Sequence, residues 1–122
     1  MIHYTAAVLT ASAQADLLAT FQPPEGWNTF AHHMTVIYGQ GLPAHLEGDA
    51  GEKVQLVATH IGKSDKAIAI KVSGYWSNNK IPHVTIAVDT ANGGKPVDSN
   101  KIENWKAIKP LTLEGIVTEV QK

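Results

Sequence analysis

The sequence predicts an α+β domain in which antiparallel strands dominate and two short helices accompany them. Three observations support this class. Runs of β-branched and aromatic residues recur along the chain, and helical spacing of apolar residues is confined to two short segments. The short segment GKSD (62–65) separates two strand-like runs as a hairpin turn would. With 122 residues, the chain fits a single domain spanning positions 1–122.

The first half of the chain predicts a strand, a helix and a second strand. IHYTAAVLT (2–10) has strand composition, and SAQADLLATF (12–21) repeats apolar residues at helical spacing. Pro23 and Pro24 end that helix, because proline lacks the N–H that a helix interior requires. HHMTVIY (32–38) follows as the second strand.

The second half begins with three strands and continues with a second helix. The strands are predicted over 53–61, 66–74 and 81–89. We then expect Ser99 to cap a short helix, NKIENW (100–105). The full order is strand, helix, strand, two strands, strand, helix, strand, which divides into two similar halves.

LTLEGIVTEV (111–120) is predicted to close the chain as a strand. Leu111 and Leu113 share one alternation phase, whereas Ile116 takes the other. We therefore expect a β-bulge at Gly115, where the inward face would switch.

The charge balance and cysteine usage restrict the function classes. The chain has 10 basic and 11 acidic side chains, which argues against a long electrostatic track for duplex nucleic acid but allows a small nucleotide or a single RNA end. The absence of cysteine excludes disulfides and thiolate metal sites, and it fits a reducing cytosol.

MIHYTAAVLT has neither a basic leader nor a long apolar core, and no apolar run approaches the roughly 20 residues of a membrane span. We expect a monomeric cytoplasmic protein without a membrane partner.

Two distant segments share a pattern that carries chemistry. HMTVI (33–37) and HVTIA (83–87) are both His-x-Thr followed by apolar residues, and both lie on predicted strands. Residues two apart on a strand project to the same face, so each segment presents an imidazole beside a hydroxyl. The four polar residues are His33, Thr35, His83 and Thr85.

If the two strands are close in one sheet, this set suits phosphoester cleavage without a metal. One imidazole would remove a proton, the other would donate one, and the hydroxyls would stabilise phosphate oxygens. On spacing alone, two unrelated strand histidines explain the pattern equally well. A third match, His3-Tyr4-Thr5, shows how easily it arises, and we assign His3 to ordinary first-strand sequence.

Other candidate residues have two interpretations each. Tyr75 and Trp76 either stack a nucleobase or cap the core, and Lys80 either meets phosphate or is only solvated. In a regular strand, His32 would point away from His33, so we expect it to be structural or at the surface. No cluster of His, Asp and Glu at ligand spacing indicates a metal site.

HHMTVIYG (32–39) and PHVTIAVD (82–89) resemble the two signature motifs of the 2H phosphoesterase superfamily. Its members include LigT-like RNA cyclic phosphodiesterases, cyclic phosphodiesterase domains of tRNA ligases, and phage nucleases that degrade cyclic-nucleotide signals. The resemblance implies a two-lobed, pseudo-symmetric α+β fold with a central cleft between the motifs. It implies His33 and His83 as the acid–base pair, and Thr35 and Thr85 as phosphate binders.

The activity implied by the resemblance is hydrolysis of a 2′,3′-cyclic phosphate, on an RNA end or a nucleotide, without a metal or cofactor. Of the subgroups, the tRNA ligase-type domain is the comparison we favour. Two alternatives stay open: a non-catalytic module that binds a nucleotide or an RNA end on the same fold, and a nuclease for cyclic oligonucleotide signals.

Overall fold

The computed structural model describes residues 2–121, which form one α-helix, three short 3₁₀ helices and seven strands. The helix α1 spans Ala11–Thr20. The 3₁₀ helices are η1 (Ala44–Leu46), η2 (Thr90–Asn92) and η3 (Pro96–Lys101). The strands are β1 (Ile2–Leu9), β2 (Asn28–Thr29), β3 (His33–Tyr38), β4 (Lys53–Lys63), β5 (Ala67–Ser73), β6 (His83–Val88) and β7 (Trp105–Gln121).

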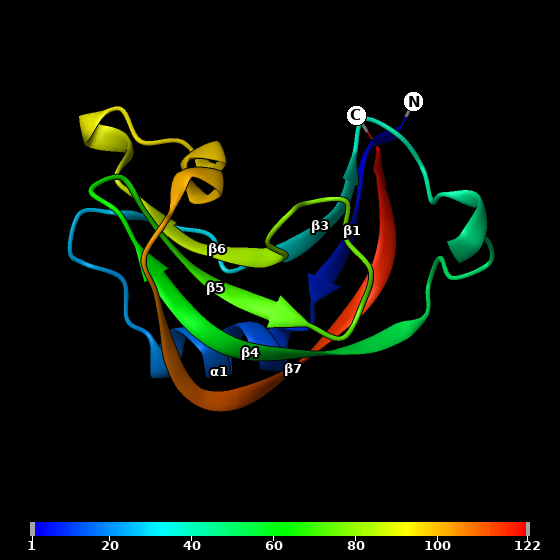
Figure 1. Cartoon of the computed structure of the whole chain (residues 1–122), viewed down its shortest axis with the longest axis horizontal. Coiled ribbons are helices and arrows are strands. Elements are labelled where there is room, and N and C mark those ends of the chain that lie inside the picture. The colour runs from blue at the N-terminus through cyan, green and yellow to red at the C-terminus, as the bar shows by residue number, and fades with distance from the viewer. Residues whose placement is uncertain (1, 122) are drawn as a thin grey trace.

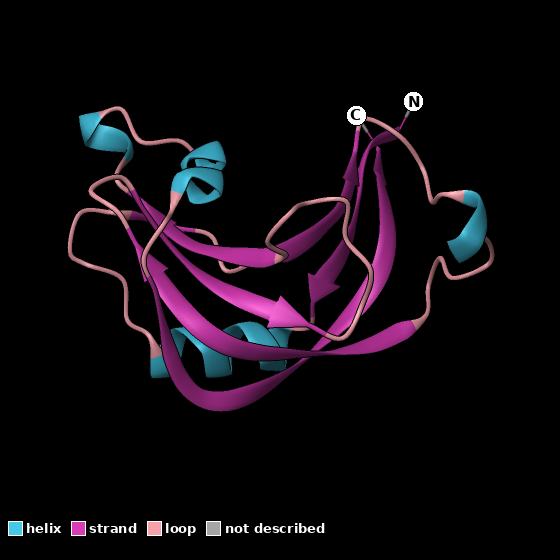
Figure 2. Ribbon diagram, in the orientation of Figure 1, coloured by secondary structure: helices cyan, strands magenta, loops and turns pink. Residues whose placement is uncertain are grey.

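All seven strands belong to one antiparallel sheet. Their order is β2-β6-β3-β1-β7-β4-β5, and β5 also pairs with β6, so the pairings close on themselves. The strands curve strongly, with α1 among the lower strands of the view, where it contacts β7, and with η2 and η3 above one end (Figure 1). Strands account for most of the regular structure (Figure 2). The predicted α+β class with antiparallel strands is therefore confirmed.

The main core occupies the sheet face against which α1 packs. Leu17 of α1 is fully buried and belongs to one apolar cluster with residues from six strands, including Met34, Ile70, Val84 and Leu113. Burial of such side chains contributes about 1.5–3 kcal/mol each. The core thus fixes which face of each strand points inward, and it leaves the opposite face for polar residues.

A smaller apolar cluster lies on the opposite face, where β5 approaches η3. Ala67 and Ala69 of β5 pack there against Ile102 and the partly buried Trp105. Gly62 makes room for them, because a Cβ at this position would lie 2.6 Å from the Ile102 side chain. This cluster anchors the segment that follows η3.

Most predicted elements are confirmed with shifts of one or two residues at their ends, but the last strand, predicted over 111–120, begins six residues earlier at Trp105. The helix predicted over 12–21 is α1, and Thr10 caps it by accepting a hydrogen bond from the Ala13 N–H at 3.2 Å. The predicted hairpin joins β4 to β5, where the Ser64 hydroxyl accepts hydrogen bonds from the N–H groups of Lys66 and Ala67.

The predicted helix over 100–105 is wrong. The chain forms the 3₁₀ helix η3 over Pro96–Lys101 instead, and β7 already begins at Trp105. The turn starts early because the Lys95 N–H donates to the Asp98 carboxylate at 2.8 Å. Ser99 is therefore buried within η3 and does not cap a helix.

The predicted bulge at Gly115 is also wrong. Gly115 pairs with Leu9 on one side and Val54 on the other without a shift in register. The pairing of β7 with β4 is irregular earlier in the strand, between Leu111 and Ala107, and this stretch contains Pro110. Proline has no N–H to donate to a neighbouring strand, which explains the position.

Replacing Gly74 by Ala tests the close packing between β5 and β4. Gly74 has φ +114°, and an added Cβ would lie 2.3 Å from the Gln55 carbonyl oxygen. Gly93 is a matched control, since it has φ +84° but nothing within 4 Å of a Cβ. Gly93→Ala should cost about 1 kcal/mol of unfolding free energy from backbone strain alone, and Gly74→Ala about 1–3 kcal/mol more. Equal urea midpoints for the two variants would contradict this.

Candidate active site

The two His-x-Thr segments lie on neighbouring strands. The register sets Met34 of β3 opposite Val84 of β6, and both side chains are fully buried in the core. Residues on either side of this pair therefore point to the other face of the sheet. Because the strands run antiparallel, each histidine is set toward the threonine of the other segment, which gives the site local two-fold symmetry.

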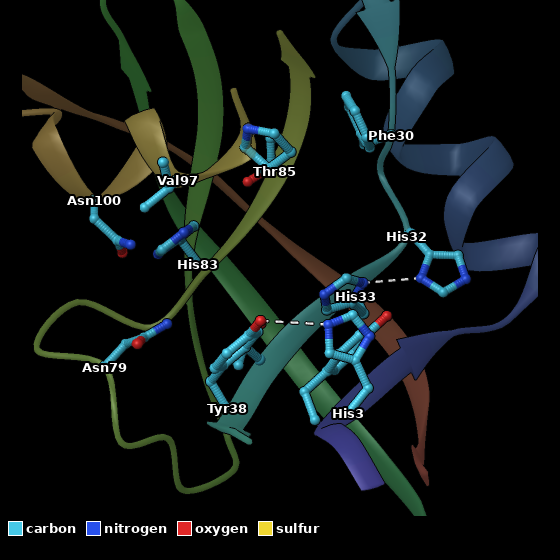
Figure 3. Close-up of a pocket in the computed structure, with 13 residues that line it drawn as sticks. His3, Phe30, His32, His33, Tyr38, Asn79, His83, Thr85, Val97 and Asn100 are labelled. Atoms are coloured by element: carbon cyan, nitrogen blue, oxygen red, sulfur yellow. Dashed lines mark hydrogen bonds between the residues drawn. The ribbon is translucent and has the colours of Figure 1, made fainter. Parts of the chain in front are cut away.

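The four polar residues line one cavity of about 750 Å³, which we call the central cavity. Its wall comes from β1, the segment before β3, β3 itself, the 74–82 loop, β6 and η3 (Figure 3). The lining residues are His3, Tyr4, Phe30, His32, His33, Thr35, Tyr38, Asn79, His83, Thr85, Pro96, Val97 and Asn100.

A kink in the backbone sets the position of His33. Ala31 is buried with φ +48°, an uncommon conformation for a residue other than glycine, and β3 begins two residues later. The Nδ1 atoms of His32 and His33 consequently lie 2.9 Å apart, a hydrogen bond in which one ring donates and the other accepts. The ring of Tyr4 stacks on His33 with centroids 4.9 Å apart, so the imidazole is held from two sides.

His83 is buried, and a backbone carbonyl fixes its tautomer. Its Nδ1 lies 2.8 Å from the Ile81 carbonyl oxygen, which can only accept. Nδ1 therefore carries the proton, and in the neutral ring Nε2 has a free lone pair. His83 is thus arranged to accept a proton at Nε2.

The two threonines differ in their surroundings. Thr85 Oγ1 lies 2.8 Å from Ser99 Oγ, so η3 is tied to β6 through a buried hydroxyl. When Ser99 donates in this pair, the Thr85 proton is free for a ligand. The carbonyl of Thr35 accepts a hydrogen bond from Ser77 Oγ at 2.7 Å, which ties the loop that carries Asn79 to β3.

Both imidazoles are easier to keep neutral than a free histidine. The pKa of His33 is lowered to about 4, first because burial disfavours the charged ring and then because His32 and His83 repel a positive charge there. Burial also lowers the pKa of His83, opposed by its hydrogen bond to the Ile81 carbonyl. At neutral pH, the unliganded site therefore holds two neutral imidazoles.

A second, smaller cavity of about 290 Å³ adjoins the first, and we call it the side cavity. It shares Asn79, His83 and Asn100 with the central cavity. Its other lining residues are Asn78, Lys80, Ile81, Ser99, Ile102 and Trp105.

Of the three residues predicted to bind substrate, one lines a cavity and two lie elsewhere. Lys80 lines the side cavity beside His83. Tyr75 instead packs against the main core, and its hydroxyl donates to Asp49 at 2.8 Å. Trp76 lies edge-to-face with His45, with ring centroids 4.8 Å apart. Neither aromatic residue lines the two cavities.

Two histidines that were not predicted as site residues line the central cavity. His3 lines the central cavity, and the hydroxyl of Tyr38 lies 3.4 Å from its Nε2. His3 is the extra residue where the pairing of β1 with β7 shifts between Ile2 and Tyr4, and this irregularity lets His3 line the same cavity as Tyr4. His32 is exposed, as predicted, but it contacts the ring of His33 instead of pointing away from it, because the kink at Ala31 takes His32 out of the strand.

A scan against protein-family models and a search of curated proteins both gave no match to this chain. Across residues 2–121, no group of three or more His, Cys, Asp or Glu side chains is arranged to hold a metal ion. In the same range, no helix is both long and apolar enough to cross a bilayer. Function is therefore inferred from the site itself.

The lowered pKa of His33 makes folding stability depend on pH. The unfolded chain binds a proton at this ring near pH 6.5, whereas the folded chain does so only near pH 4. Stability from the neutral ring is therefore complete above pH 6.5 and is lost as the pH falls toward 4. Between pH 6.5 and pH 4, wild type should lose up to about 3 kcal/mol of unfolding free energy through this ring. His33→Gln should not show this loss, because its side chain does not titrate. Urea unfolding of both proteins across this pH range measures the difference. A difference between the two proteins that does not change with pH would contradict this.

Proposed function

We propose that this protein is a phosphodiesterase of the 2H class that hydrolyses a 2′,3′-cyclic phosphate on an RNA end or a nucleotide. The observation that carries the proposal is the register of Met34 opposite Val84. It turns two His-x-Thr segments, fifty residues apart in sequence, toward one cavity. The finer fold assignment, a two-lobed 2H architecture, rests on this local symmetry and on the resemblance of the motifs.

The site supplies the groups that this hydrolysis needs. Water attacks phosphorus, the bond from phosphorus to one ribose oxygen breaks, and a phosphomonoester with a free hydroxyl is formed. His83 takes the proton from water at Nε2, since Ile81 holds its Nδ1 proton. The hydroxyls of Thr35 and Thr85 donate to the non-bridging oxygens, where negative charge grows in the transition state.

His33 supplies the proton to the leaving ribose oxygen. Once protonated, its Nδ1–H donates to His32, and its Nε2–H points to the leaving group. The bound phosphate favours this charged form, because an anion next to an imidazole raises its pKa. His32 therefore acts as a positioning residue, and the low pKa of His33 in the empty site is compatible with acid catalysis in the loaded one.

His33→Ala and His83→Ala should each lower kcat for a 2′,3′-cyclic nucleotide by about 10²-fold or more, the scale of a lost general acid or base. The rate is followed as release of nucleoside monophosphate in EDTA. His45→Ala is the control, because His45 is exposed in η1 and lines neither cavity.

Full activity in either histidine variant would overturn the acid and base roles of His33 and His83. Ligand binding by wild type without any turnover would instead identify a non-catalytic nucleotide-binding module. Cleavage of cyclic oligonucleotides in preference to cyclic phosphates would identify a nuclease for such signals.

A further inference from the structure

We propose that the substrate carries a second phosphate group, which binds in the side cavity beside Lys80. The substrate class is then an oligonucleotide end, whose terminal nucleotide has a phosphodiester at its 5′ oxygen as well as the 2′,3′-cyclic phosphate. This inference rests on the proposed function, because it assumes that the cyclic phosphate reacts between His33 and His83.

The two cavities meet at the residues that would touch the reacting phosphate. His83 lines both cavities, as do Asn79 and Asn100. The cyclic phosphate and the 5′-phosphate of a terminal nucleotide are attached to one ribose ring. When the cyclic phosphate lies at His83, the second phosphate is therefore only one ribose away. Two adjoining cavities can accommodate phosphates at this separation.

The side cavity has the chemistry of an anion site. Lys80 is the one lysine among the residues of the described range 2–121 that line either cavity, and the chain contains no arginine. Asparagine amides add hydrogen-bond donors, and no Asp or Glu in that range lines either cavity. A phosphate there would meet a positive charge and several donors without a nearby carboxylate to repel it.

The central cavity differs from the side cavity in polarity and charge. The two ends of the ligand would therefore bind in different environments. Of the three large hydrophobic side chains exposed in residues 2–121, Tyr38 (72% exposed) and Val97 (55% exposed) both line it. No lysine from the same residues does. An apolar, uncharged mouth suits the face of a base, whereas the cation beside His83 suits the second phosphate.

The test compares two substrates that differ only in the second phosphate: uridine 2′,3′-cyclic phosphate and its 5′-phosphorylated form. Wild type should cleave the 5′-phosphorylated form with a kcat/KM about tenfold or more higher, the scale of one charge-assisted hydrogen bond. Lys80→Ala should remove most of this preference, and Lys80→Arg should retain part of it. Lys53→Ala is the matched control, because Lys53 is an exposed lysine at the start of β4 outside both cavities.

Each outcome separates the two claims. Equal kcat/KM for both substrates, or a preference that survives Lys80→Ala, would overturn the second-phosphate site while leaving the phosphodiesterase intact. Failure to cleave either substrate, or an RNA dinucleotide ending in a cyclic phosphate, would overturn the proposed function itself. Circular dichroism of Lys80→Ala that matches wild type keeps the comparison free of folding effects.

Discussion

The pairing of β3 with β6 is the constraint on which the site depends. These strands share a single register pair, Met34 opposite Val84, yet each strand is held by a longer ladder to its other neighbour. Both residues of the pair are fully buried, so a slip by one position would expose them and turn the polar residues into the core. The hydrophobic core thereby determines that His33 and His83 face the same cavity.

The same constraint shapes the electrostatics of the site. Bringing two imidazoles into one partly buried wall lowers the pKa of each, chiefly by desolvation. Within residues 2–121, no carboxylate lines either cavity to compensate this. A bound phosphate supplies the missing negative charge, which makes an anionic ligand and a protonated His33 mutually stabilising. The hydrogen bonds of His83 to Ile81 and of His33 to His32 then give the two rings unequal roles.

The sequence predicted the parts of this site that follow from local alternation. The period of two along a strand is enough to pair each histidine with its threonine on one face. It does not predict His3, because that residue reaches the cavity through an irregularity in the pairing of β1 with β7 between Ile2 and Tyr4. It misplaces His32, because a positive φ at Ala31 interrupts the alternation. The second helix failed for a related reason: the hydrogen bond from Lys95 to Asp98 starts a tighter turn before the expected cap.

The most direct test of the shared site is ³¹P NMR of uridine 2′,3′-cyclic phosphate incubated with the EDTA-treated protein. The cyclic phosphate resonance should be replaced by one phosphomonoester resonance, either the 2′ or the 3′ isomer. A single isomer follows because His83 and His33 occupy fixed sides of the reacting phosphorus, so only one ribose oxygen can receive the proton. A cyclic phosphate resonance that remains unchanged, or an equal mixture of both isomers, would contradict a site in which the two histidines act together.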